Sequence, residues 1–171
     1  PVTSTDFTTT KCRIKGDVGL LNKDTVTFAG YVNLSGTTIA GLNGSPFIFQ
    51  VGGASFEGRF NAKGQVVNQR GGPLVFEDGS KMTVNVNARS GQLSGQITKA
   101  SLSKKLDAIN LANRSTKRFS LGMNICGLPG TIGVSASDVL EFTTKRTGDV
   151  YQADYQLGKL GQSLGGAFQI I

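Results

Sequence analysis

Short runs of alternating apolar and polar residues, separated by glycine-rich turns, account for most of this sequence. The clearest run covers residues 82–88, where Met82, Val84 and Val86 alternate with polar residues. A period of two places the apolar side chains on one face of a β-strand. Similar runs occur at 11–15, 25–34, 46–51, 118–126 and 149–157, and the chain's 24 glycines suit the tight turns between them. This pattern predicts an all-β fold.

The expected architecture is an antiparallel β-sandwich, or two fused sandwiches built from pseudo-repeats. Each half of the chain places a strand pair before a connector, a run rich in large apolar residues and a glycine turn. We therefore expect a linker at 1–10, a first β pseudo-repeat at 11–78 and a second one packed with it at 79–160. Residues 161–171 are expected to be a tail or a last strand.

One segment departs from the β pattern. In residues 101–111 the apolar residues Leu102, Leu106 and Ile109 follow one another at spacings of four and three. That spacing places them on one face of an α-helix, and a serine at the start of the segment is a suitable N-cap. The segment predicts one short helix of two turns that crosses the ends of the sheet.

Two cysteines, Cys12 and Cys126, are the only thiols of the chain. Neither belongs to a CxxC pair, and the absence of histidine leaves no zinc-ligand set. They either form a disulfide or remain two buried free thiols. We expect the disulfide, which the loop-entropy treatment credits with about 4–5 kcal/mol for a loop of this length.

The formal net charge is +7, from 18 basic and 11 acidic residues. The basic residues are scattered, and no aromatic RNA-binding motif accompanies them, so we expect no specific nucleic-acid partner. They form either a solvated basic surface or one that attracts acidic polymers such as cell-wall or matrix polysaccharides. No apolar run reaches the roughly 18 residues of a membrane span, and membrane insertion is not expected.

The residue types argue against catalysis. Without histidine, Ser-His-Asp and Cys-His arrangements cannot form. A Ser-Lys pair within 101–104 would require a buried lysine, whereas Lys104 and Lys105 are expected to be solvated. No carboxylates pair recognisably as in glycosidases. We expect a non-enzyme without cofactors, and a structural calcium held by Asp17 with Asp24, or by Asp138 with Glu141, is the alternative left open.

Ligand binding is expected to involve the polar face of the strand at 25–34. Tyr31 lies opposite the apolar residues of that strand, so its ring is the best candidate for an exposed sugar platform, with Asn33 on the same face. Tyr151 and Tyr155 share a face with Leu157 and are expected to pack in the core or at its rim. The predicted ligand-binding residues are therefore Tyr31 and Asn33.

Three stretches carry a resemblance to known proteins: Phe-Ile-Phe-Gln-Val-Gly-Gly at 47–53, Asn-Ala-Lys-Gly at 61–64, and the segment at 101–111 before a strand. Residues 25–157 thereby resemble a repeated β-rich module of large secreted or surface proteins of environmental bacteria. The two cysteines depart from that module. The resemblance implies an extracellular or cell-surface location and neighbouring domains as partners.

We therefore expect a structural or adhesive spacer of a larger secreted or surface protein. Because the chain begins at Pro1 rather than Met, we expect it to be a processed or excised piece. The alternatives are a carbohydrate-binding module and a subunit of a capsid, fibre or surface-layer assembly. An exposed Tyr31 among polar side chains would favour the carbohydrate-binding module.

Overall fold

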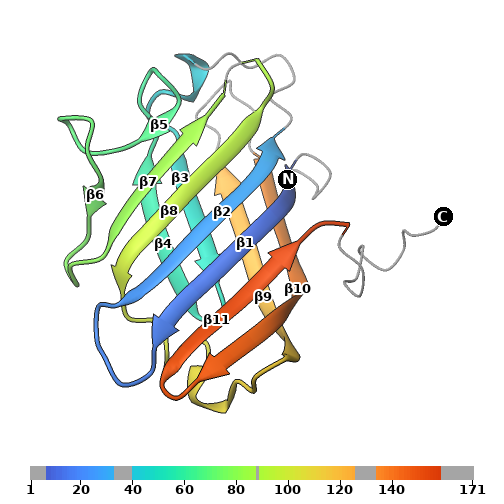
Figure 1. The fold of residues 1–171 in the computed structure, drawn as a ribbon. Coiled ribbons are helices and arrows are strands. Elements are labelled where there is room, and N and C mark those ends of the chain that lie inside the picture. Colours follow the sequence, from blue (N-terminus) through green and yellow to red (C-terminus); the bar gives the residue numbers. More distant parts are fainter. Residues whose placement is uncertain (1–6, 33–39, 88, 126–133, 159–171) are drawn as a thin grey trace.

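Eleven β-strands form one antiparallel sheet in the computed structural model, which describes residues 7–32, 40–87, 89–125 and 134–158 (Figure 1). The strands are β1 (Phe7–Asp17), β2 (Asp24–Val32), β3 (Pro46–Val51), β4 (Ala54–Arg59), β5 (Gln65–Val66), β6 (Leu74–Val75), β7 (Lys81–Val86), β8 (Gln92–Ala100), β9 (Ser115–Ile125), β10 (Val134–Thr147) and β11 (Val150–Gln156). Two short 3-10 segments, η2 (Ala40–Leu42) and η3 (Ala108–Asn110), complete the described elements. The all-β prediction is confirmed.

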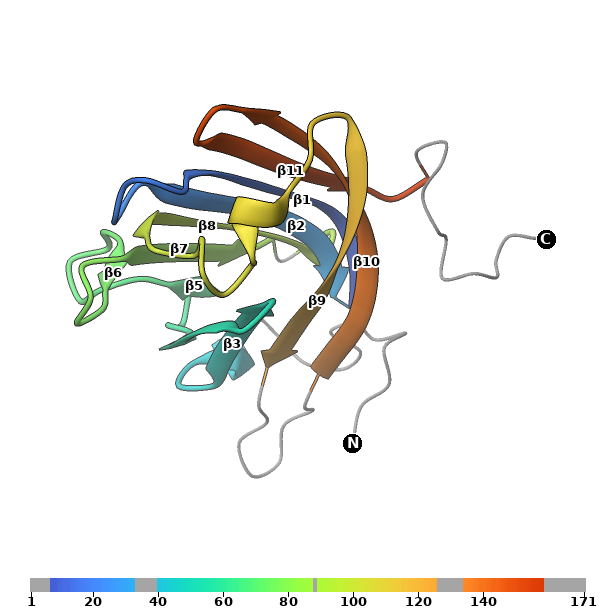
Figure 2. The same ribbon diagram turned by 90° about the horizontal axis from the view of Figure 1, so that it is seen from below.

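The sheet curls until its two ends almost meet. Its order is β4-β3-β9-β10-β11-β1-β2-β8-β7-β5, with β6 paired to β7. A single bridge between Phe60, which follows β4, and Val66 of β5 joins the first and last strands of this order. Figure 2 shows β10 bending from one wall of this barrel-like sheet to the other. Apart from this bridge, the described residues show β4 paired only with β3, so the sheet is nearly closed rather than a complete barrel.

Apolar side chains on the inner face fill the space inside the sheet. They form one buried cluster to which every long strand contributes. Phe28 of β2 stacks on Phe49 of β3, with ring centroids 4.1 Å apart and planes 10° apart. Gly95 of β8 permits this stack, because a Cβ there would lie 2.2 Å from Cζ of Phe28. The interior is thus a packed core that joins opposite walls.

The segment between β8 and β9 crosses one end of the barrel (Figure 2). Asp24, at the start of β2, is fully buried, and its Oδ2 accepts a hydrogen bond from the backbone N–H of Leu102 at 2.6 Å. Arg146 of β10 donates from Nη1 to the carbonyl oxygen of Ala108 at 2.7 Å. A buried carboxylate and a guanidinium therefore fix the crossing segment from two sides.

The predicted helix in this segment is wrong. Its only helical element among the described residues is the 3-10 turn Ala108–Asn110. Asp107 adopts a left-handed conformation with φ 53°, which interrupts an α-helix. Leu102 and Leu106 are buried as expected, but Ile109 is 69% exposed, because the break turns it away from the core.

The expected sandwich is not confirmed either, because the described strands belong to one barrel-like sheet. Strands from the two expected pseudo-repeats alternate within it: β2 pairs with β8, and β3 pairs with β9. The sheet also begins earlier than expected, since β1 starts at Phe7 and so includes residues 7–10 of the expected linker. The expected tail at 161–171 lies outside the described residues.

Candidate functional site

Polar side chains cover the outer face of the wall formed by β10, β11, β1, β2, β8 and β7. Because side chains alternate along a strand, the apolar inner face leaves every second position free to be polar. The strand registers align these positions into rows, of which one, here called the central row, contains Thr143, Asp154, Arg13, Thr27, Gln96 and Thr83. Adjacent strands lie about 4.8 Å apart, so six strands give a row about 24 Å long.

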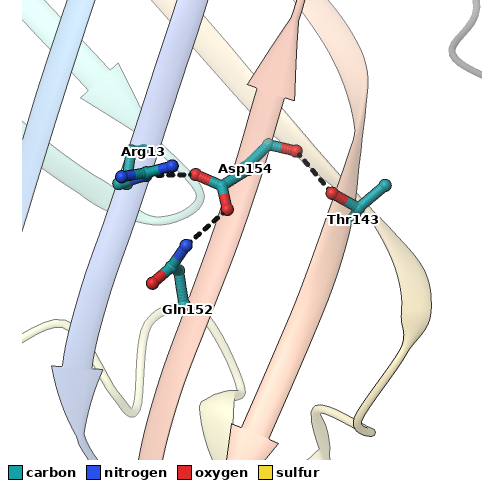
Figure 3. A network of polar contacts seen from close by, with 4 residues as sticks. All are labelled: Arg13, Thr143, Gln152 and Asp154. Carbon is teal, nitrogen blue, oxygen red and sulfur yellow. Dashed lines mark hydrogen bonds and ion pairs between the residues drawn. The ribbon is translucent and has the colours of Figure 1, made fainter. Parts of the chain in front are cut away.

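Asp154 is held by its neighbours within the central row (Figure 3). Its Oδ1 accepts a hydrogen bond from Nε of Arg13 at 2.5 Å, and its Oδ2 accepts one from Nε2 of Gln152 at 2.6 Å. Thr143 donates from its hydroxyl to the backbone carbonyl of Asp154 at 3.4 Å. Both carboxylate oxygens therefore have partners, and the carboxylate is fixed between β1 and β11.

Three exposed lysines surround this fixed carboxylate. Lys15 and Lys145 both pair in register with Gln152, one from β1 and the other from β10. Lys11 of β1 lies on the other side of the central row, opposite Gln156. Within the described part of the chain, none of the three lysines forms an ion pair. The one central carboxylate is thus taken up by Arg13, and the lysine charges are uncompensated.

Three shallow hollows follow one another across this face. The first, of about 440 Å³, lies over Arg13, Asp154 and Thr27 and has Lys11 and Lys145 at its sides. The second, of about 550 Å³, shares Thr27 with the first and continues over the polar residues Gln65, Thr83, Asn85, Ser94 and Gln96. The third, of about 490 Å³, shares Thr143 and Lys145 with the first and extends to Arg114, Ser115 and Thr116. Because neighbouring hollows share lining residues, the three lie side by side along this face and are here called the depression. Hydroxyl, amide and cationic side chains line the first two.

The residues predicted to bind ligand lie beside this depression or outside the described residues. Tyr31 is 49% exposed and lies on the outer face of β2, opposite Thr8 of β1 and Gln92 of β8. Asn33 lies outside the described residues. Tyr151 and Tyr155 are buried in the core, as expected. Tyr31 is therefore an exposed tyrosine on the same wall as the central row, and its role in binding stays a prediction.

Cys12 is a free thiol, so the expected disulfide with Cys126 is not formed in this structure. Cys12 points into the core of the barrel from β1, whereas Cys126 lies outside the described residues. Burial raises the pKa of the Cys12 thiol far above its usual range, and the negative charge of Asp154 adds to the effect. The neutral thiol behaves as a small apolar side chain of the core.

The other candidates from the sequence do not come together as sites where their side chains are described; the side chain of Asp138, expected beside Glu141, lies outside the described part. Ser103 donates its hydroxyl hydrogen bond to the buried carboxylate of Asp24 at 3.4 Å, whereas Lys104 is exposed. The carboxylate of Asp24 accepts backbone hydrogen bonds from Asp17 and Leu102. Among residues 7–32, 40–87, 89–125 and 134–158, no three carboxyl, thiol or imidazole groups gather as a metal site would require.

Comparison with protein families, curated proteins and solved structures finds no match to this chain. The helical elements of the described residues are also too short to cross a membrane. The site is therefore interpreted from its own geometry.

Sequence reasoning missed the centre of the face, Asp154 with Gln152, Thr143 and Lys145. One signal was present: in 151–156 each buried residue alternates with Gln152, Asp154 or Gln156, which marks an outward polar row. What the sequence did not contain is the pairing, because 141 positions separate Arg13 from Asp154. Only the register of β1 with β11 brings them together.

Proposed function

We propose that the chain is a non-catalytic carbohydrate-binding module whose outer sheet face holds an extended polysaccharide. The observation that carries this proposal is the row of three adjacent hollows, which share Thr27 on one side and Thr143 with Lys145 on the other. A row of shallow hollows suits a chain-like ligand that lies along the surface. We place the module outside the cell, where such polymers are found.

The chemistry of the depression supports a ligand rich in hydroxyl groups. Threonine hydroxyls and glutamine or asparagine amides both donate and accept hydrogen bonds, as sugar hydroxyls do. Thr27, Thr83 and Gln96 supply three such side chains on adjacent strands of the central row. The half-exposed ring of Tyr31, on the same wall, is available to stack on a sugar ring.

The test compares two triple variants of equal chemistry. Thr27→Ala, Thr83→Ala and Gln96→Ala together remove two hydroxyls and one amide from the depression. The matched control is Ser55→Ala, Ser120→Ala and Gln50→Ala, which removes the same groups from exposed positions on β4, β9 and β3. Retention on a panel of soluble and insoluble polysaccharides is measured by affinity electrophoresis and pull-down, after far-UV spectra show that both variants fold.

The expected result is that the parent chain and the control bind at least one glycan, while the first triple variant loses most of that binding. Failure of the parent chain to bind any glycan would overturn the proposal. Equal binding by the two triple variants would show that the depression is not the binding surface.

A structural or adhesive spacer of a larger secreted or surface protein is the second candidate. It is favoured by the way the barrel end is fixed, with Asp24 and Arg146 holding the crossing segment from two sides. A rigid unit of this kind transmits force between neighbouring domains without a ligand. A chain that unfolds cooperatively at high urea and binds no glycan would favour the spacer.

A further inference from the structure

One region of the outer face holds four cationic side chains on β1 and β10, more than the carboxylates beside them can balance. Lys11, Arg13 and Lys15 occupy every second position of β1 and are all exposed, and Lys145 lies two strands away on β10. Asp154 is the carboxylate that contacts this group, through Arg13. Asp17 follows Lys15 by two residues on the same face of β1, and Glu141, two residues before Thr143 on β10, pairs with Arg118. Within the described residues Lys11, Lys15 and Lys145, here called the lysine cluster, form no ion pair.

The strand registers set the spacing of the lysine cluster. Lys15 and Lys145 flank Gln152 in one row, so their backbones lie two strands, or about 10 Å, apart. Lys11 lies four residues from Lys15 along β1, which corresponds to about 14 Å. The backbones of the three lysines therefore lie on both sides of the Arg13–Asp154 pair, about 10–14 Å apart, a spacing that several acidic groups along one chain can match.

Arg13 adds hydrogen-bonding capacity at the centre of the lysine cluster. Its Nε is taken by Asp154, but no further hydrogen bond of its guanidinium is formed within the described ranges. Asp154 holds the guanidinium in place, which lowers the ordering cost when its terminal nitrogens bind an incoming acidic group.

We propose that the lysine cluster and Arg13 recognise the acidic groups of a polysaccharide, so the ligand class is an acidic glycan rather than a neutral one. This deepens, and rests on, the proposed carbohydrate-binding function. Repeated acidic groups along one chain match several separated cations. A nucleic acid is a poorer match, because among the described residues no exposed aromatic ring on which a base could stack lines the hollow over Arg13.

Polygalacturonate and its fully methyl-esterified form are the two probes, because they share one sugar backbone and differ in charge. Each exposed ion pair contributes little, but three together predict at least about a tenfold difference in Kd at low salt. We expect polygalacturonate to bind at least tenfold more tightly than the ester at about 20 mM salt, with most of that difference lost at about 300 mM. A sulfated glycan in a parallel measurement shows whether sulfate replaces carboxylate.

Two triple variants separate the lysine cluster from the net charge. The first variant combines Lys11→Gln, Lys15→Gln and Lys145→Gln. Its affinity for polygalacturonate should fall about tenfold, and its affinity for the ester should not change. The control combines Lys63→Gln, Lys104→Gln and Lys105→Gln. It removes equal charge from exposed positions in two connecting segments. Its affinity for polygalacturonate should stay within about twofold of that of the parent chain.

Each other outcome has a distinct meaning. Equal affinity for the acid and the ester, or an equal loss in the two variants, would overturn the acidic-glycan inference and leave the proposed function standing. Binding only to a neutral glycan of the wider panel would also overturn the acidic-glycan inference and leave the proposed function standing. Binding to no glycan would overturn both. Tighter binding to single-stranded RNA that the Lys11→Gln, Lys15→Gln and Lys145→Gln variant loses would assign the lysine cluster to nucleic acid.

Discussion

Replacing the buried Asp24 by asparagine tests how the end of the barrel is held. The carboxylate is fully buried and accepts hydrogen bonds from the N–H groups of Leu102 at 2.6 Å and Asp17 at 3.1 Å. In Asp24→Asn one oxygen becomes an NH2 group, which cannot accept, so one backbone N–H loses its partner. A charged hydrogen bond contributes about 1.5–3 kcal/mol, and an unsatisfied buried donor costs about 1–3 kcal/mol.

The neutral amide avoids the cost of burying a charge, which offsets part of this loss. We therefore expect Asp24→Asn to lower the free energy of unfolding by about 3 kcal/mol, a large share of the roughly 5–15 kcal/mol typical of a domain. Urea unfolding followed by circular dichroism gives the value. The exposed Glu57→Gln on β4 is the control and should change it by less than about 0.5 kcal/mol.

Hydrogen exchange provides the local readout of the same variant. The amide of Leu102 should exchange faster in Asp24→Asn than in the parent chain. Its N–H either loses the side-chain oxygen of residue 24 as an acceptor or shares the one oxygen that remains with the N–H of Asp17. A change in unfolding free energy below about 1 kcal/mol, together with unchanged protection at Leu102, would refute the anchoring role of Asp24.

Three further predictions follow from the core. Gly95→Ala should destabilise the fold by about 1–3 kcal/mol in urea unfolding, because the new methyl group meets the ring of Phe28, and an unchanged midpoint would contradict this packing. Burial raises the pKa of Tyr151 and of Cys12, so above about pH 9 the unfolded chain loses protons that the folded chain keeps, and stability should fall as pH rises. Tyr151→Phe should reduce that fall and change stability little at pH 7, because the buried hydroxyl lies near Ser103 and Asp24 without a hydrogen bond of normal geometry. A clear loss of stability at pH 7 would show that it forms one. In a Cys126→Ser background, Cys12 should resist iodoacetamide in the native state and react in urea, whereas rapid native labelling would show that the thiol is accessible.

Alternation in the sequence was sufficient to identify which side chains face inwards. Met82, Val84 and Val86 are buried as their spacing predicts, and so are the apolar residues of β9. Alternation is a property of a single strand, however, and carries no information about its partners. The barrel-like closure depends on pairings such as β2 with β8 and β3 with β9, which the expected division into halves did not anticipate.

The wrong helix prediction at 101–111 and the unpredicted central row have the same physical origin, because tertiary contacts determine both structures. Leu102 and Leu106 have helical spacing, but the fold holds Leu102 through Asp24 and sets Asp107 in a left-handed conformation. The central row likewise exists only once distant strands pair. The sequence showed that Tyr31 faces outwards, whereas Asp154 became recognisable only beside Arg13.

The most direct test of the central claim is a titration of the isotopically labelled chain with oligogalacturonate, followed by amide chemical shifts. We expect saturable shifts concentrated on β10, β11, β1 and β2, strongest around Arg13, Asp154 and Lys145. Shifts concentrated on β3 and β4 instead, or no shifts with this or any other glycan, would contradict the assignment of the outer face as a polysaccharide-binding surface.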